Sequence, residues 1–203
     1  MLMVLAATAS ALEARPARAA GGAYVVDDVE VGAVGSCKVE SWTSFASNSD
    51  FIGVVQPACV VSLGRPVELS AAVARFRDAS EWGSEIVLKA KTNLIPIEPS
   101  KVGVGLAAGM AIDPINRLVN GLFVTIPVSY QLHETVRLNF NGGWLWNANT
   151  DVLTVIWGGG FEWNLIKPVT LIGEVFGELG PDTNRDPRAQ VGLRFTPQES
   201  FDI

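Results

Sequence analysis

The sequence predicts an all-β protein, an antiparallel up-and-down β-barrel of about ten strands. Apolar and polar residues alternate in runs of about 9 to 13 residues. Turn-forming segments such as SNSD, GRP, DPINR, NANTD and GPDTNRDP separate these runs. Helical periodicity is scarce, and the longest apolar run, VGVGLAAGMAI at residues 102–112, is shorter than the ~18 residues of a membrane-spanning helix. Together these patterns favour one closed or double-layered sheet.

Each strand follows from an alternating run between two turns. In VRLNFNGGWLW, residues 136–146, Val136 and Leu138 share one face of the expected strand, while Arg137 and Asn139 share the other. The same reasoning predicts strands near residues 38–46, 51–62, 67–77, 85–94, 101–112, 118–132, 135–146, 152–164, 169–179 and 188–196. Arg75 and Arg77 break the pattern, because they fall on the apolar side of the third strand. A bulge, or an earlier end of that strand, would resolve this exception.

The apolar faces are expected to contact lipid. A soluble sandwich or lipocalin-like barrel would also alternate, but strands of about 10 to 12 residues match a tilted crossing of a bilayer. Aromatic residues near strand ends predict interfacial girdles, formed by Tyr130, Trp144, Trp146, Trp157 and Trp163. The polar faces would then line a lumen and contact solutes through Lys89, Lys91, Asn93, Arg137, Asn139, Asn141, Glu162, Glu174, Glu178, Arg188 and Arg194.

The two cysteines are predicted to form a disulfide. If the first hairpin turns at residues 47–49, Cys37 lies opposite Cys59 on the neighbouring strand, and both have the same parity. An even number of cysteines in an exported chain favours a bridge, which would staple the hairpin. A pair of thiols is the alternative, and a metal site is not expected because no histidine accompanies the pair.

The first residues have the character of an export signal. MLMVLAATASAL is a short apolar run, and ARPARAA offers small residues at 17 and 19, so residues 1–19 are expected to be a signal peptide with an incomplete positive region. Residues 20–203 would then form the barrel. The formal charge of −6 argues against a nucleic-acid-binding protein, which needs a basic surface.

Four segments carry a family resemblance. They are CKVESWTSFASNSDFIGVVQPACVVSLGRPVEL, VSYQLHETVRLNFNGGWLW, GGGFEWNLIKPVTLIGEVFGELG and DPRAQVGLRFTPQESFDI. The chain resembles uncharacterised outer-membrane barrels of Gram-negative bacteria, notably alphaproteobacteria, often labelled putative transporters or porin-like. That resemblance implies a fold and a location in the outer membrane. Because the chain stops at SFDI without a terminal aromatic strand, we expect a truncated barrel, with perhaps twelve strands in full.

The sequence offers little for catalysis. The single histidine, His133, lies four positions from Ser129, about 13 Å along an extended strand, too far for a nucleophile and its base. Glu162, Glu174 and Glu178 show no closed pocket with separated pKa values. The glycines at 103–109 and 158–160 lack the context of a phosphate loop and favour a close approach within a barrel. We therefore expect no cofactor, no metal and no enzymatic activity.

Two functional classes remain. The first is a porin-like channel or transporter that passes small solutes by diffusion through a polar lumen in the outer membrane. The second is a non-conducting barrel with a structural or surface-interaction role, because small barrels fill with side chains. Lipid is the expected partner in both cases, and nucleic acid in neither.

Overall fold

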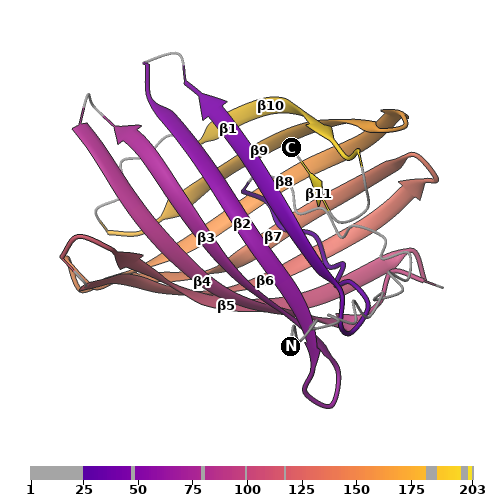
Figure 1. Cartoon of the computed structure of the whole chain (residues 1–203), viewed down its shortest axis with the longest axis horizontal. Coiled ribbons are helices and arrows are strands. Elements are labelled where there is room, and N and C mark those ends of the chain that lie inside the picture. Colours follow the sequence, from indigo (N-terminus) through magenta and orange to yellow (C-terminus); the bar gives the residue numbers. More distant parts are fainter. Residues whose placement is uncertain are drawn as a thin grey trace, which may run out of the picture.

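The computed structural model describes residues 25–46, 49–78, 81–98, 100–116, 118–181 and 187–197, with the backbone of 201–202. Figure 1 shows that the long strands run side by side and curl strongly into half of a barrel. The elements are β1 (Cys37–Phe45), β2 (Phe51–Ser62), β3 (Pro66–Asp78), β4 (Glu81–Ile95), β5 (Val102–Asp113), β6 (Leu118–His133), β7 (Val136–Asn147), β8 (Val152–Ile166), β9 (Val169–Leu179), β10 (Arg188–Phe195) and β11 (Phe201–Asp202).

The topology confirms the predicted all-β fold of ten antiparallel up-and-down strands, which here form a strongly curled half-barrel (Figure 1). The sheet order is β10-β9-β8-β7-β6-β5-β4-β3-β2-β1-β11, so each long strand pairs with its neighbours in sequence. All pairs among β1 to β10 are antiparallel, whereas the short β11 pairs with β1 in parallel. Within the described residues, no helix has the length and apolar character needed to span a membrane. The expected signal peptide lies outside the described residues.

The predicted strand ends agree with the structure within a few residues, with one larger difference. The predicted fourth strand starts at residue 85, but β4 begins at Glu81, so the connection after β3 is much shorter than expected. Gly83, a turn former in sequence, instead sits within β4, where an added Cβ would lie 2.3 Å from the Phe76 ring. The glycine therefore makes room for an aromatic side chain on the neighbouring strand.

The predicted exception at Arg75 and Arg77 is real, and both proposed explanations for it are wrong. β3 continues to Asp78, and its pairing with β4 runs without a shift from Glu68 to Asp78. The two arginines therefore lie at the same parity as Leu69 and Val73, on the face of the sheet that is opposite the buried Glu68. Local alternation places them correctly, and no bulge turns them inward.

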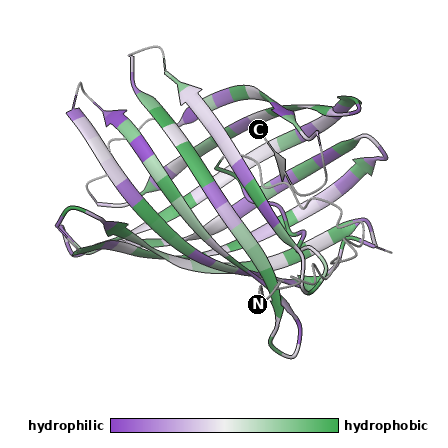
Figure 2. Ribbon diagram, viewed as in Figure 1, coloured by the Kyte–Doolittle hydropathy of each residue, from purple (hydrophilic) through white to green (hydrophobic). Residues whose placement is uncertain are grey.

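The two faces of the sheet differ in character. Residues paired across strands share a face, which places Glu68, Lys91 and Ala107 together on the concave side. The convex side is apolar and exposed, with an alternation that is visible along the ribbons in Figure 2. Its exposed side chains include Val73, Leu88, Leu106, Val124, Trp144, Val155, Val175 and Val191.

The interior holds an apolar cluster and a returning segment of chain. Val54, Ala72 and Ala74 are buried against the concave side of β2 and β3. Residues 25–36 precede β1 without regular structure, and their first part lies inside the curl. Val26, Asp28 and Val29 are 1%, 0% and 1% exposed, so these three residues are as deeply buried as any residue of the wall.

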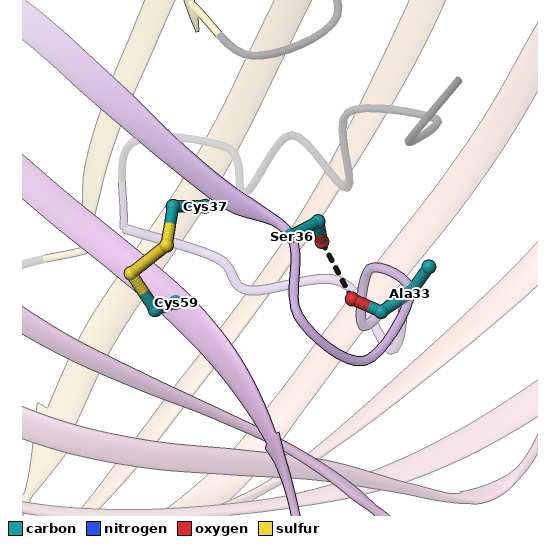
Figure 3. Close-up of a disulfide and its surroundings, with 4 residues drawn as sticks. All are labelled: Ala33, Ser36, Cys37 and Cys59. Atoms are coloured by element: carbon teal, nitrogen blue, oxygen red, sulfur yellow. Dashed lines mark hydrogen bonds between the residues drawn. A yellow bond between two sulfur atoms is a disulfide. The ribbon is translucent and has the colours of Figure 1, made fainter. Parts of the chain in front are cut away.

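The predicted disulfide is confirmed. Cys37 pairs directly with Cys59 across β1 and β2, and their sulfurs are 2.08 Å apart (Figure 3). Just before it, Ser36 Oγ donates to the carbonyl of Ala33 at 2.6 Å, and the Gly35 amide donates to Val60 O at 2.8 Å. The bridge and this turn fix the point where residues 25–36 join the first strand.

Candidate functional site

The predicted lumen residues lie on the concave face of the sheet. Strand pairing places them there through the partners Lys91–Ala107, Arg137–Glu162 and Glu174–Gln190. This set contains Lys89, Lys91 and Asn93 on β4, Arg137, Asn139 and Asn141 on β7, Glu162 on β8, Glu174 and Glu178 on β9, and Arg188 and Arg194 on β10. Residues 25–30, which we call the inner segment, contact Lys89, Lys91, Arg137, Asn141 and Glu174 of this set.

Two aspartates of the inner segment meet the cations of the wall. Asp28 lies 3.1 Å from Lys91 Nζ and 3.0 Å from Arg137 Nη2, and thus joins β4 to β7. Asp27 lies 2.7 Å from Lys89 Nζ and 3.6 Å from Lys91 Nζ. The side chain of Asp28 is 0% exposed and that of Lys91 only 1%, so this is a fully buried ion pair. Such charges persist in an interior only when they are paired and hydrogen-bonded.

Further ion pairs extend from Arg137 toward the last strand. Arg137 lies 2.9 Å from Glu162 and 2.7 Å from Glu30 of the inner segment. Glu162 also accepts hydrogen bonds from Asn139, at 2.6 Å, and from Arg194 of β10. The carboxylate of Glu162 therefore joins β7, β8 and β10.

A second group extends toward the first strand. Lys38 of β1 lies 3.2 Å from both Glu40 and Glu68, and Glu68 lies 4.0 Å from Lys91. Together with the pairs around Asp28 and Arg137, these contacts form an ion-pair network that crosses the interior from β1 to β10. A network of this kind fixes the relative positions of strands that do not pair through their backbones.

Polar side chains of the wall also bind the backbone of the inner segment. Glu174 accepts hydrogen bonds from the amides of Val25, at 3.2 Å, and Val26, at 3.1 Å. Ser129 Oγ accepts from the Val29 amide at 3.1 Å and donates to Asn139 at 2.7 Å. With its side-chain amide oriented to match its neighbours, Asn141 accepts a hydrogen bond from the backbone N–H of Asp27 and donates one to the backbone carbonyl of Asp27. An irregular backbone is thus satisfied by side chains instead of by a strand.

Glycines of the wall allow the inner segment to approach closely. A Cβ added to Gly158 of β8 would lie 2.7 Å from the side chain of Val26, and one added to Gly103 of β5 would lie 2.5 Å from that of Val29. These residues belong to the two glycine-rich stretches for which the sequence favours a close approach within a barrel. Larger side chains here would occupy the space of the inner segment.

The charges of the wall hold both aspartates ionised. Burial raises the pKa of Asp27, but Lys89 and Lys91 outweigh this effect and lower it to about 2. Burial likewise raises the pKa of Asp28, and Lys91 and Arg137 bring it below its ordinary value. The inner segment therefore keeps its negative charge at neutral pH.

A cavity remains beside the inner segment. It has a volume of about 200 Å³ and lies between Val25, Val26, Glu178 and Arg188, toward the ends of β9 and β10 at which residues 180–187 connect them. Of the predicted lumen residues, Asn141, Glu178 and Arg188 line it. This part of the interior could hold water or a small solute.

The predicted girdle residues all lie on the convex face. Tyr130, Trp144 and Trp163 are exposed, and Trp146 donates to Asp151 at 3.0 Å near the end of β7. Trp157 lies near the middle of β8, opposite Gly142 and Gly177, and so is not at a strand end. A further tryptophan, Trp82, occupies the start of β4. Trp82 is absent from the predicted girdle because the predicted fourth strand begins at residue 85, later than β4.

Ser129 and His133, the two groups considered for catalysis, do not interact with each other in the described structure. Ser129 Oγ is engaged with Val29 and Asn139, whereas His133 is exposed at the following turn and contacts Thr135 at 3.2 Å. The polar side chains of the interior are instead arranged around the inner segment.

The position of the inner segment inside the sheet was not predicted from the sequence. Its signal was the run VVDDVE at residues 25–30, which is acidic, too short for a strand and placed before β1. Its charge complements that of Lys89, Lys91 and Arg137, which the sequence had already placed together on one face. Complementary charge between an unassigned segment and a predicted wall could therefore have indicated the contact.

The chain belongs to the family described as Uncharacterised conserved protein UCP029691, whose model matches residues 8–203. No curated protein matches the chain, and no solved structure does.

Proposed function

We propose that this chain forms an outer-membrane β-barrel of a Gram-negative bacterium whose interior is closed by the inner segment. The observation that carries the proposal is the combination of an apolar convex face with a charged concave face whose charges are satisfied within the protein. A soluble barrel would bury the apolar face instead. In lipid, a sheet must satisfy its backbone and turn apolar side chains outward, as this one does along β2 to β9.

The filled interior favours a non-conducting resting state. The ion-pair network and the inner segment occupy the space that a diffusion pore would need. Lipid is the partner of the convex face, and the proposal assigns no catalytic residue and no cofactor. The barrel would then have a structural or surface-interaction role.

The test uses the full-length protein refolded in detergent and checked for heat-modifiable gel migration. The proposal expects fractionation with the outer membrane and insertion into a planar bilayer without current steps. A protein recovered in the periplasmic fraction that fails to insert would refute the membrane location. Stable current steps from the wild type would refute the closed interior.

A second candidate function is passage of small hydrophilic solutes after the inner segment moves. Two observations favour it. The inner segment is not part of any strand, and a cavity lies beside it at Glu178 and Arg188. The double variant D27N/D28N should then conduct while the wild type does not. The exposed Glu98, in the turn before β5, supplies the control variant E98Q, which should stay closed.

A further inference from the structure

The convex face carries an isolated pair of charges. Among the outward-facing positions of β1 to β10, Arg75 and Arg77 are the only ones with an Asp, Glu, Lys or Arg side chain. Both lie toward the end of β3 at which residues 79–80 connect it to β4. An isolated pair of positive charges on a largely apolar surface is a candidate site for a partner of opposite charge.

Aromatic rings surround the two arginines. Both guanidinium groups lie over Trp82, Arg75 at 5.0 Å and Arg77 at 5.6 Å from the ring centre. The ring of Trp82 also packs edge-on against that of Phe51, with 6.0 Å between the ring centres. Trp82 is half exposed, so this surface combines an apolar aromatic ring with the two positive charges that lie over it.

The hydrogen bonds that the arginines make to described residues use only part of their donors. Arg75 Nη1 donates to Ser84 Oγ at 2.8 Å, and Arg77 donates through Nε and Nη2 to the carbonyl of Ser49. Each guanidinium has five N–H donors, more than these contacts use. Among the residues that the structure describes, no carboxylate lies within ion-pair distance of either arginine. The hydrogen bonds to Ser84 and Ser49 orient the two guanidinium groups but do not neutralise their positive charge.

We propose that Arg75, Arg77 and Trp82 form a binding site for the anionic phosphate headgroup of a membrane lipid. The phosphate would accept hydrogen bonds from the two guanidinium groups, a geometry in which arginine is favoured. The acyl chains would lie on Val55 and Val73, which pair with each other just below Gly53 and Arg75 and are 51% and 56% exposed. This contiguous apolar surface favours a lipid over dissolved phosphate. The inference depends on the proposed membrane location.

The experiment measures contact between Trp82 and lipid. The full-length protein is reconstituted in phosphatidylcholine vesicles with increasing fractions of phosphatidylglycerol that carries brominated acyl chains, which quench tryptophan on contact. The difference between wild type and the variant W82F isolates the signal of Trp82. We expect half-maximal quenching of Trp82 at a phosphatidylglycerol fraction about three- to tenfold lower in wild type than in R75Q/R77Q.

A matched variant separates the site from general charge. R65Q/K101Q removes two positive charges from the turns at the opposite end of the strands, and it should keep the wild-type dependence. Equal dependence in wild type and R75Q/R77Q, or its loss in R65Q/K101Q, would overturn the inference. Full competition by inorganic phosphate would overturn it in favour of a free-anion site.

Failure of the membrane location gives a different result. Vesicles made entirely of brominated phosphatidylcholine should quench Trp82 in the wild type, in R75Q/R77Q and in R65Q/K101Q if the convex face contacts lipid. Absence of that quenching would overturn the proposed function, whereas quenching without a preference for phosphatidylglycerol would overturn only the lipid site.

Discussion

Replacement of Asp28 by asparagine tests whether the inner segment stabilises the fold. The variant D28N keeps the size of the side chain and removes its charge between Lys91 and Arg137. Breaking a buried ion pair by removing one partner costs about 3 to 5 kcal/mol. Lys91 retains Asp27 at 3.6 Å, and Arg137 retains Glu162 at 2.9 Å, which offset part of the loss. We therefore expect the free energy of unfolding to fall by about 2 to 3 kcal/mol.

The assay is urea unfolding of the refolded protein in detergent micelles, followed by tryptophan fluorescence and gel migration. Glu98 supplies the control, because it is exposed in the turn before β5, and E98Q should change the unfolding free energy by less than about 0.5 kcal/mol. If D28N behaves as E98Q does, the inner segment is not bound in the interior and the reasoning fails.

A double-mutant cycle separates the pair from its surroundings. K91M alone leaves Asp28 without its lysine, whereas D28N/K91M removes both charges. The double variant should lose about 1 to 3 kcal/mol less than the sum of the single variants, because no charge of the pair then stays buried alone. Additive losses would show that Asp28 and Lys91 do not interact.

Three further outcomes are expected from the same unfolding measurement. The folded pKa of Asp27 is about 2, below its ordinary value of 3.8, so the stabilisation that it provides is complete above about pH 5 and is lost as the pH falls toward 2; D27N should flatten this dependence. G103A should cost about 1 to 3 kcal/mol because its Cβ would meet Val29, whereas G142A, with no atom within 4 Å of its Cβ, should change little; equal losses would refute the close approach. C37S/C59S should lower the unfolding free energy by about 3 kcal/mol relative to the oxidised wild type, since the bridge closes a loop with a sequence separation of 22, and full reduction of the wild type should reproduce that loss.

The sequence predicted the strands and the disulfide because both depend on local pattern. Alternation with a period of two and turn residues such as NANTD are properties of short windows, so β7 and β8 could be placed within a few residues. The pairing of Cys37 with Cys59 followed from one hairpin turn. The parity of Arg75 and Arg77 was also correct, and only the assumption that charge must turn inward was wrong.

The position of the inner segment could not be predicted in the same way. Its contacts join residues separated by up to 149 positions, such as Val25 and Glu174. No local window contains both partners, and the segment has neither periodicity nor strand length. Trp82 was missed for a smaller reason, because Gly83 and Ser84 read as a turn although they continue β4.

If the inner segment can leave the interior, as the second candidate function requires, the charges of the wall decide which ions enter. With Asp27 and Asp28 in place, the charges of Lys89, Lys91 and Arg137 are matched at short range. If the segment leaves, Lys89 loses the carboxylate that lies 2.7 Å from it, and Lys89 and Lys91 create a local excess of positive charge on this part of the wall. Water and anions would then be drawn into the interior. Any current through D27N/D28N should therefore prefer anions, and the reversal potential in a salt gradient measures that preference directly. A cation-selective current would mean that ions follow a path that avoids this wall.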